Sequence, residues 1–491
     1  MVRFQGFIGG TYSLQSVSAD CQRCVNLFPQ VNEQRTAENG EIGALFRTPG
    51  KTLLGTIGTG PIRGTYTATN GNFYVVSGNG LYQVDTTWSG TLLGTLSSSV
   101  GRVQFQDNGV QMVITDGNGY VWDFASLAPV AGVVPPQFQS LANTSGWLGS
   151  NCAAYLDQWG IFAEPGTNAF YTSNQLDFAT YDGLNVAYKQ GHNDPIVSII
   201  SDKGNVWLMG RETSEIWYNA QNAPPGIVLS RIPGSLIEIG CCSPHSPQQI
   251  MNTIIWLGDG KHGAGVVWQA QGYAPNRIST HAIEVALQSY GYTNLQNATA
   301  YTYQQDGHGF YVLNVPTAPV SWVYDVVTGQ WHERMHLVNG LETRDQGDCH
   351  AWWNQQHVVG DYQNGNLYAL DKASFMANGQ PMRWMRRSPK LVEDMAWMFH
   401  DSFQADMEVG TGLDGTGQGI QPQVMLRYSN DMGHTWSCEL WRTSGAIGQY
   451  RQRPIWRNLG RSRSRIYELS GTDPVSVTLL GAELGITPGT P

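Results

Sequence analysis

Residues 332–336 read His-Glu-Arg-Met-His, which is the H-E-x-x-H signature of zinc hydrolases. That signature binds a metal only on a helix, where residues four positions apart lie on one face. Residues 323–331 instead predict a strand, a Thr-Gly turn and a returning strand, which places both histidines on a strand. Histidines at positions i and i+4 of a strand lie about 13 Å apart, whereas a zinc–nitrogen bond measures about 2.0–2.1 Å. We therefore interpret the match as coincidental.

Two further patterns resemble parts of a metal site. Glu342 lies where an extended form of the zinc signature has its third ligand, but Asn339 replaces the glycine of that form. Cys21 and Cys24 have the spacing of half a zinc knuckle, and no second cysteine pair or nearby histidine completes it. The seven cysteines are an odd number and do not form a secreted disulfide framework. We predict no catalytic residue, no metal and no cofactor.

Residues 429–436 match the pattern S-x-D-x-G-x-T-W completely and so resemble the Asp-box of sialidases. In that family the aspartate closes a turn between two strands, the tryptophan packs beneath it, and neither is catalytic. The resemblance implies a structural turn made by Ser429, Asp431, Gly433 and Trp436. Sialidases repeat the motif within their propeller blades, whereas here it occurs once, outside the repeats described below. A glycan-binding or glycan-hydrolysing propeller is the alternative function that this motif leaves open.

Seven arginines and no acidic residue lie between positions 442 and 466, in a chain with 28 basic and 38 acidic residues. Guanidinium groups in such a stretch bind the carboxylates of a neighbouring subunit or the phosphates of DNA. The spacing Arg-x-Arg-x-Arg fits a solvated strand face as well. We favour contact with another subunit or protein partner. The seven residues are Arg442, Arg451, Arg453, Arg457, Arg461, Arg463 and Arg465.

A repeat of 39 residues indicates the scaffold that positions these segments. The pentapeptide Thr-Leu-Leu-Gly-Thr at 52–56 recurs at 91–95, and the apolar run 73–76 corresponds to 112–115. A repeat of this length with short strands and Asn-Gly turns is typical of propeller blades. Hairpin patterns continue to about residue 371, seven in all. We predict a six- or seven-bladed β-propeller over 51–371, and favour seven because pairing of the terminal strands closes the ring.

The rest of the chain divides into three segments. Residues 1–50 do not repeat and predict an extended N-terminal arm that docks on the platform or on a neighbouring subunit. Residues 372–400 show no hairpin pattern and are interpreted as a linker. Residues 401–491 return to strand patterns and predict a C-terminal platform domain resembling a β-sandwich. The whole chain is therefore expected to be all-β.

One helix is expected within the repeats. Ser279 or Thr280 caps its N-terminus, Gly291 ends it, and its apolar face consists of Ile283, Leu287 and Tyr290. Because a propeller is closed on itself, we expect this helix outside the ring or at its rim.

The composition restricts the function classes. Charged residues make up only 13% of the chain, against about 25% in typical soluble domains. Few charges and many aromatic residues suit a surface covered by other subunits, although a glycine-rich all-β protein with polar loops has the same composition. The net charge of −10 argues against general nucleic-acid affinity. Residues 1–7 lack the apolar core of a signal peptide, and no stretch has the length of a membrane span. We expect synthesis in a cytoplasm and no membrane insertion.

Several short motifs follow one another along nearly the whole chain. They lie at 26–29 with 46–50, 215–218, 277–284, 403–410 and 456–461. In this order they resemble the motifs of the tail-hub, or tail-nozzle, proteins of short-tailed phages, also called packaged-DNA stabilisation proteins.

This resemblance implies a structural virion protein without catalytic residues. It implies a homohexameric ring below the portal and its adaptor ring, which extends the DNA exit channel, retains packaged double-stranded DNA and docks tail fibres or spikes. It also implies a place in the virion tail after synthesis in the host cytoplasm. The arginine-rich segment would then belong to the platform domain and face neighbouring subunits or the adaptor. A glycan-directed propeller and, less favoured, a zinc metalloprotease are the alternatives.

Overall fold

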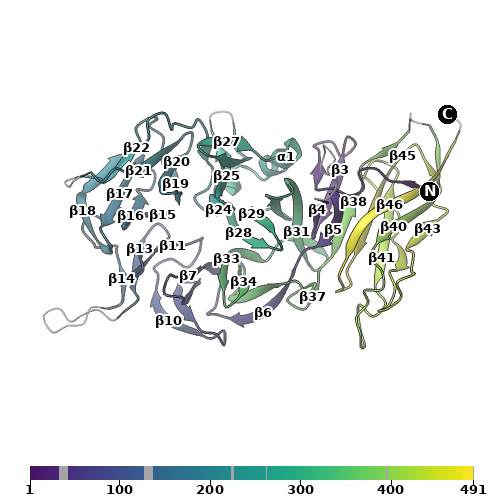
Figure 1. Ribbon diagram of the computed structural model, residues 1–491, viewed down its shortest axis with the longest axis horizontal. Helices are drawn as coiled ribbons and strands as arrows, with labels where there is room; N and C mark the ends of the chain where they lie inside the picture. Colours follow the sequence, from purple (N-terminus) through teal and green to yellow (C-terminus); the bar gives the residue numbers. More distant parts are fainter. Residues whose placement is uncertain (33–41, 126–135, 223–225, 261–262, 394–395, 490–491) are drawn as a thin grey trace.

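The computed structural model describes the whole chain except residues 33–41, 126–135, 223–225, 261–262, 394–395 and 490–491. The molecule is elongated, with a ring of β-sheets at one end and a pair of packed sheets at the other (Figure 1). Both chain ends lie at the end that holds the packed sheets. The C-terminal and N-terminal parts of the sequence therefore meet there.

Seven sheets follow one another round the ring in the described part of the chain. The first two contain β7 (Ile62–Thr67), β8 (Phe73–Ser77), β9 (Gly80–Val84) and β10 (Gly90–Thr95), then β11 (Gln104–Asp107), β12 (Gln111–Thr115), β13 (Gly119–Asp123) and β14 (Phe138–Ser140). The third and fourth contain β15 (Ala153–Leu156), β16 (Trp159–Ala163), β17 (Ala169–Asn174) and β18 (Asp177–Tyr188), then β19 (Ile196–Asp202), β20 (Asn205–Gly210), β21 (Ser214–Asn219) and β22 (Leu229–Arg231).

The remaining sheets complete the ring. The fifth contains β23 (Gly240–Cys241), β24 (Gln248–Ile250), β25 (Thr253–Asp259), β26 (Val266–Gln271) and β27 (Ala274–Arg277). The sixth contains β28 (Thr299–Gln305), β29 (His308–Asn314), β30 (Ser321–Asp325) and β31 (Gln330–Val338), with β32 (Leu341–Arg344) paired to β31. The seventh contains β33 (Gly347–Trp353), β34 (Gln356–Asp361), β35 (Asn366–Asp371) and β6 (Gly50–Thr56). Strand β33 contacts β7, so the last sheet meets the first.

The ring is closed by pairing between its two ends, as expected. Strand β6 precedes all the other propeller strands, yet it forms the outermost of the four blade strands of the last sheet by antiparallel pairing with β35. The short strand β36 (Met376–Ala377) pairs with its other side. The predicted β-propeller of six or seven blades is confirmed. The 39-residue repeat also has a structural meaning, because its two pentapeptides are β6 and β10, the outer strands of neighbouring sheets. Both strands skip one residue in their pairing, Leu54 in β6 and Leu93 in β10. The repeated sequence therefore reproduces the same β-bulge.

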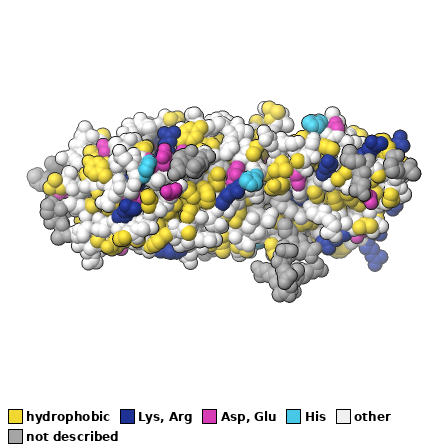
Figure 2. Space-filling view, turned by 90° about the horizontal axis from the view of Figure 1, so that it is seen from above, with side chains coloured by type: hydrophobic (Ala, Val, Ile, Leu, Met, Phe, Trp, Pro, Cys, Tyr) yellow, Lys and Arg dark blue, Asp and Glu magenta, His cyan; other side chains and the backbone are white. Residues whose placement is uncertain are grey.

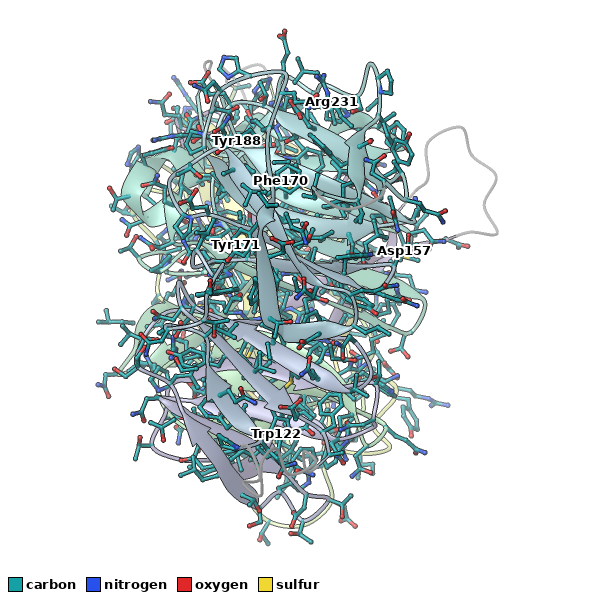
Figure 3. All side chains as sticks on the ribbon, turned by 90° about the vertical axis from the view of Figure 1, so that its left-hand side faces the viewer. Trp122, Asp157, Phe170, Tyr171, Tyr188 and Arg231 are labelled. Atoms are coloured by element: carbon teal, nitrogen blue, oxygen red, sulfur yellow. The ribbon has the colours of Figure 1, made fainter. Side chains whose placement is uncertain are left out.

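Side chains of the blade strands bury both faces of their sheet. In β17, Phe170 packs against Trp217 of the fourth sheet with ring centroids 4.9 Å apart. The next residue, Tyr171, instead joins the cluster that contains Val113 and Val121 of the second sheet. Figure 3 shows both residues at the end of the propeller farthest from the packed sheets. Because neighbouring blades cover each sheet on both sides, middle strands such as β8, β25 and β29 are buried at every position rather than at alternate ones.

The glycines of the repeated pentapeptide lie against aromatic residues of the next unit along the chain. A Cβ on Gly94 would lie 2.3 Å from the ring of Phe138, and one on Gly55 would lie 2.8 Å from the carbonyl oxygen of Trp88. We expect Gly94→Val to lower the free energy of unfolding by about 1–3 kcal/mol through overpacking. Urea unfolding measures the change. Gly183→Val is the matched control, because no atom lies within 4 Å of its would-be Cβ; equal effects of both variants would contradict the packing argument.

The expected helix is α1 (His281–Ser289), and Thr280 caps it by accepting a hydrogen bond from the Ile283 amide. Ile283 and Leu287 are buried in the core shared with the fifth and sixth sheets. A second helix, α2 (Tyr292–Gln296), follows Gly291 and was not expected, because five residues are too short for a recognisable apolar period. No helix among the described residues is long and apolar enough to cross a membrane.

The two packed sheets form the predicted C-terminal β-sandwich. One contains β4 (Leu27–Val31), β5 (Ile42–Arg47), β46 (Thr478–Pro488), β40 (Met398–Met407) and β43 (Ile455–Arg457), with β1 (Val2–Arg3) and β44 (Arg461–Ser462) at its sides. The other contains β3 (Cys21–Val25), β38 (Trp384–Arg387), β45 (Ser464–Gly471), β41 (Gln423–Ser429) and β42 (Leu440–Thr443), with β2 (Tyr12–Ser13) and β39 (Leu391–Val392). Phe403, Leu426, Trp456 and Leu469 lie in the core between them.

The first 50 residues contribute strands to both sheets of the sandwich. Strand β3 pairs in parallel with β31 of the propeller and antiparallel with β38 of the sandwich, so that the sixth blade and one sandwich sheet form a single 12-stranded sheet. Residues 372–400 hold β38 and the short hairpin of β36 (Met376–Ala377) and β37 (Gln380–Pro381). The boundaries of the four predicted segments remain a prediction. Two strands span them, since β6 contains the boundary at residue 50 and β40 contains the boundary at residue 400.

Candidate functional site

The H-E-x-x-H residues lie on strand β31, as expected, and not on a helix. His332 is opposite Val323 of β30 in an antiparallel ladder, and both histidines are buried. The His332 ring lies 5.8 Å from the Phe310 ring, centroid to centroid. Burial lowers the pKa of His332 well below its usual value, so the ring is neutral. No group of three or more His, Cys, Asp or Glu side chains in the described part of the chain is arranged to hold a metal ion.

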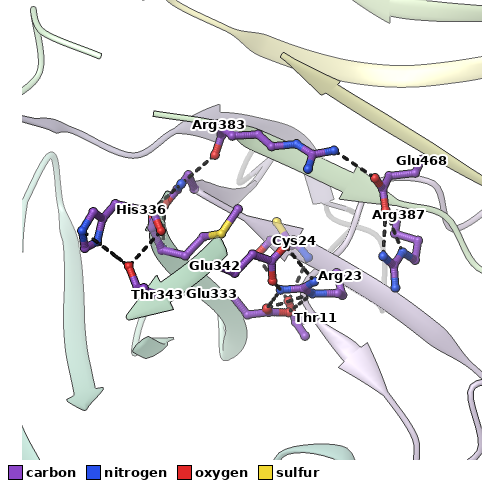
Figure 4. Close-up of polar contacts among 12 residues, drawn as sticks. Thr11, Arg23, Cys24, Glu333, His336, Glu342, Thr343, Arg383, Arg387 and Glu468 are labelled. Atoms are coloured by element: carbon purple, nitrogen blue, oxygen red, sulfur yellow. Dashed lines mark hydrogen bonds and ion pairs between the residues drawn. The ribbon is translucent and has the colours of Figure 1, made fainter. Parts of the chain in front are cut away.

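The two glutamates of the zinc-like pattern belong instead to an ion-pair network with the N-terminal arm. Arg23 on β3 contacts Glu333 at 2.6 Å and Glu342 at 3.0 Å, nitrogen to oxygen (Figure 4). Asn26 of the same arm adds two hydrogen bonds. Its side-chain amide donates to the carbonyl oxygens of Met335, at 2.9 Å, and of Arg383, at 2.6 Å. These bonds join the propeller, the arm and the sandwich. Glu333 and Glu342 therefore have a structural role here.

A second network lies within the sandwich, around the fully buried Glu468. Three guanidinium groups contact its carboxylate. Arg383 lies at 3.2 Å and Arg387 at 2.7 Å (Figure 4), and Arg427 lies at 2.6 Å. Burial opposes ionisation of Glu468, but Arg387 and Arg427 hold its pKa below the usual value. The Glu468 carboxylate is therefore charged and joins strands β38, β41 and β45.

The Asp-box residues lie in the turn between β41 and β42. The Asp431 carboxylate accepts hydrogen bonds from the Ser429 hydroxyl at 2.7 Å and the Thr435 amide at 2.8 Å, and the Gly433 amide donates to the Ser429 hydroxyl at 2.7 Å. The bonds from Thr435 and Ser429 hold the pKa of Asp431 well below its usual value. Trp436 packs under the guanidinium groups of Arg387 and Arg427, each 4.8 Å from its ring centre. The Asp431 carboxylate is thus engaged within its own turn.

Six of the seven clustered arginines are exposed, and one is not. The Arg465 side chain is buried; its Nε donates to the Asn430 side chain at 2.8 Å and its Nη1 to the Leu459 carbonyl at 2.7 Å. The sequence alternation suggested that Arg465 shares the face of Arg461 and Arg463, but strand β45 is covered on both faces, so Arg465 is not available to a partner. None of the seven makes an ion pair with an acidic residue in the described part of the chain.

The exposed arginines follow the open edge of the sandwich. Strands β42 and β43 are the last strands of the two sheets, and the Arg442 Nε joins them by donating to the Ile455 carbonyl at 3.0 Å. Figure 2 shows Lys and Arg side chains at the right-hand end of the molecule, where the sandwich lies. We name this region the arginine-rich edge. It comprises Arg442, Arg451, Arg453, Arg457, Arg461 and Arg463 with the exposed Trp441, Ile447 and Tyr450.

The three apolar members of the arginine-rich edge were missed at the sequence level. Trp441 is 52% exposed, Ile447 61% and Tyr450 73%, which is high for side chains of this size. Tryptophan, tyrosine and arginine are the residue types enriched where proteins bind one another. Their interleaving with arginines between positions 441 and 453 is the signal that would have found them. The arrangement suits protein contact better than catalysis.

A closed propeller joined to a β-sandwich is a scaffold, and the arginine-rich edge is its candidate contact surface. The family model described as "Bacteriophage P22 Gp10, beta-propeller" matches residues 9–375, and the one described as "Bacteriophage P22 Gp10, beta-sandwich" matches residues 383–487. The chain belongs to this family. It is therefore a structural tail protein of a short-tailed phage that stabilises packaged DNA, and its place is the virion tail.

Other comparisons add less. None of the curated proteins compared with this chain matches it. Among solved structures, the extracellular domain of a putative one-component system from B. thetaiotaomicron is 10% identical over 76% of this chain, with a TM-score of 0.44, and the chain spans 43% of it. The Neurospora crassa Pan2 WD40 domain is 9% identical over 66% of this chain and 96% of its own, with a TM-score of 0.41. At these TM-scores the likenesses carry no argument about this protein.

Proposed function

We propose that the protein forms a homohexameric ring, the tail hub or nozzle, below the portal and its adaptor ring. The ring extends the DNA exit channel, retains the packaged double-stranded DNA and docks tail fibres or spikes, without catalysis. The observation that carries the proposal is the arginine-rich edge, which presents cations and exposed aromatic residues at the open side of the sandwich. Membership of a phage tail family supports the setting.

The charge distribution favours another copy of the chain, or an acidic ring above it, as the partner of this edge. Seven of the 28 basic residues lie in the arginine-rich segment, which leaves 21 basic residues against 38 acidic ones elsewhere. A basic edge and an otherwise acidic surface attract one another between copies. When each copy contacts the next in the same way, the copies form a closed ring if the rotations between neighbours add up to a full turn.

The propeller then acts as a rigid spacer within the ring. Its blades are covered on both faces, its ends are joined by β6, and β3 connects its sixth blade to the sandwich. DNA can move through a ring of such chains without being bound tightly, because tight DNA binding needs many cationic contacts to phosphate and this chain has few charges. The glycan-directed alternative loses support because the Asp-box lies in the sandwich and not in a propeller blade. The zinc-protease alternative loses support because the two histidines lie on a strand.

We expect the purified protein to form hexamers, seen as six-fold rings by electron microscopy and as a hexamer by native mass spectrometry. Because the proposed contacts are charged, raising the salt from 0.05 M to 0.5 M is expected to shift the population toward smaller species. Monomers under all conditions, in the presence and absence of adaptor, would contradict the proposal. Turnover of sialosides by the monomer would instead support the glycan-directed alternative.

A further inference from the structure

The axis of the propeller holds a polar constriction that the proposed tail function does not use. Two cavities follow one another along the innermost strands of the blades shown in Figure 1. The cavity of about 460 Å³ lies at the N-terminal ends of these strands. The cavity of about 350 Å³ lies closer to their C-terminal ends. Arg102 and His245 line both cavities. These two side chains therefore lie where the two cavities adjoin, and we call this place the constriction.

Positive charge exceeds negative charge at this constriction. Arg344 pairs with Asp348 at 2.9 Å and lies 3.6 Å from the centre of the Tyr362 ring. Arg102 makes no ion pair with a described residue, and its Nη1 atom is buried without a hydrogen-bond partner among them. Arg102, Arg344 and Asp348 all line the first cavity. Burial raises the pKa of Asp348, but Arg344 and Arg102 together hold it below its usual value. The Asp348 carboxylate is thus paired with Arg344, and Arg102 has no acidic partner among the described residues.

The second residue of the constriction also has unused hydrogen-bonding capacity. The His245 Nδ1 atom is buried and has no hydrogen-bond partner in the described part of the chain. Its backbone is held in place, because the Ala300 amide donates to the His245 carbonyl at 3.0 Å. Burial and the charge of Arg102 lower the pKa of His245 to about 3, so the imidazole is neutral and offers one N–H donor. A buried polar atom without a partner is uncommon and points to a ligand or an ordered water.

We propose that this constriction binds a small oxyanion, a phosphate or carboxylate group held by the Arg102 guanidinium and the His245 imidazole. The guanidinium supplies the charge and a planar pair of donors that matches two oxygens of such a group. The neutral imidazole adds a third donor without competing for the charge. Asp116 does not compete for the Arg102 guanidinium, because it already pairs with Arg63 at 3.2 Å. The site is independent of the arginine-rich edge and of ring formation.

Isothermal titration calorimetry on the full chain at low ionic strength tests the site, with inorganic phosphate and citrate as separate probes. We expect saturable binding of about one anion per chain. Arg102→Gln is expected to weaken this binding at least tenfold, because charged hydrogen bonds are lost. Arg3→Gln is the matched control, since it removes one exposed positive charge from strand β1 of the sandwich. It is expected to bind the anion as the wild type does.

The relative affinity for the two probes distinguishes a phosphate group from a carboxylate as the natural occupant. Should Arg102→Gln fail to fold, Arg102→Lys keeps the charge and loses the paired donors, and weakened binding by this variant supports the site equally. His245→Phe is expected to weaken binding as well. Absence of saturable binding of both probes to the wild type, or unchanged binding by the Arg102 and His245 variants, overturns the proposal.

Discussion

Glu468→Gln is expected to lower the free energy of unfolding of the sandwich by about 3–5 kcal/mol. The wild-type carboxylate is fully buried, and its charge balances part of the charge on Arg383, Arg387 and Arg427. Removal of one partner from a buried ion pair leaves the others desolvated and uncompensated, and this is the costly case for buried charges. Because the protein has two structural units, the change is measured as the shift of the sandwich transition in calorimetry or urea unfolding.

The pH dependence gives this prediction a second readout. The pKa of Glu468 is lowered by folding, so its contribution to stability is present above the unfolded value of about 4.3 and is lost as the pH falls through the folded value. The difference in stability between wild type and Glu468→Gln is therefore expected to be complete at pH 7 and to shrink below pH ~4. Other carboxylates titrate in the same range, but they are common to both proteins and cancel in the difference.

The control for this experiment is Glu439→Gln, which removes one carboxylate from an exposed position between β41 and β42. Glu439 makes no ion pair with another described residue. We expect its stability to lie within about 0.5 kcal/mol of the wild type, as for most surface substitutions. Equal destabilisation by the two variants, or a difference that does not change with pH, would show that the Glu468 network is not the cause.

The propeller could be predicted from the sequence because the residues that specify each blade strand and turn lie within that strand or turn. Identical letters at 52–56 and 91–95 specify the same bulged outer strand, and the Asn-Gly turns specify the hairpins between strands. The cap at Thr280 and the strand at residues 332–336 were predicted for the same reason. In each case the deciding residues lie within a few positions of the element that they define.

The connection between propeller and sandwich was not predictable in the same way. Val25 pairs with Glu333, and Arg23 reaches Glu342, across more than 300 residues of sequence. Nothing within the first 50 residues specifies such partners, so the sequence predicts only an extended arm. The burial of Arg465 has a related cause, because its exposure depends on whether β38 and β41 flank β45 and not on the Arg-x-Arg spacing.

The combined variant Arg457→Ala and Arg461→Ala is expected to weaken ring or adaptor assembly roughly 30- to 150-fold, or about 2–3 kcal/mol per interface. Both side chains are exposed in the monomer, and the contact of Arg461 within its own chain is with Trp397, 4.7 Å from guanidinium carbon to ring centre. The variant is therefore expected to fold normally. Sedimentation velocity across a concentration series measures the assembly, and thermal unfolding measures the fold.

The matched control is Lys203→Ala with Lys372→Ala, which removes two positive charges from exposed positions on the propeller, each side chain being 56% exposed. If net charge alone governed assembly, both double variants would weaken it equally. If the arginine-rich edge is the contact, only the arginine variant will do so, and its defect will be greatest at low salt, where paired charges contribute most. Wild-type assembly by the arginine variant would exclude these two residues from the interface. The contact would then have to lie among the other members of the edge, of which the exposed Trp441 and Tyr450 are the largest apolar ones.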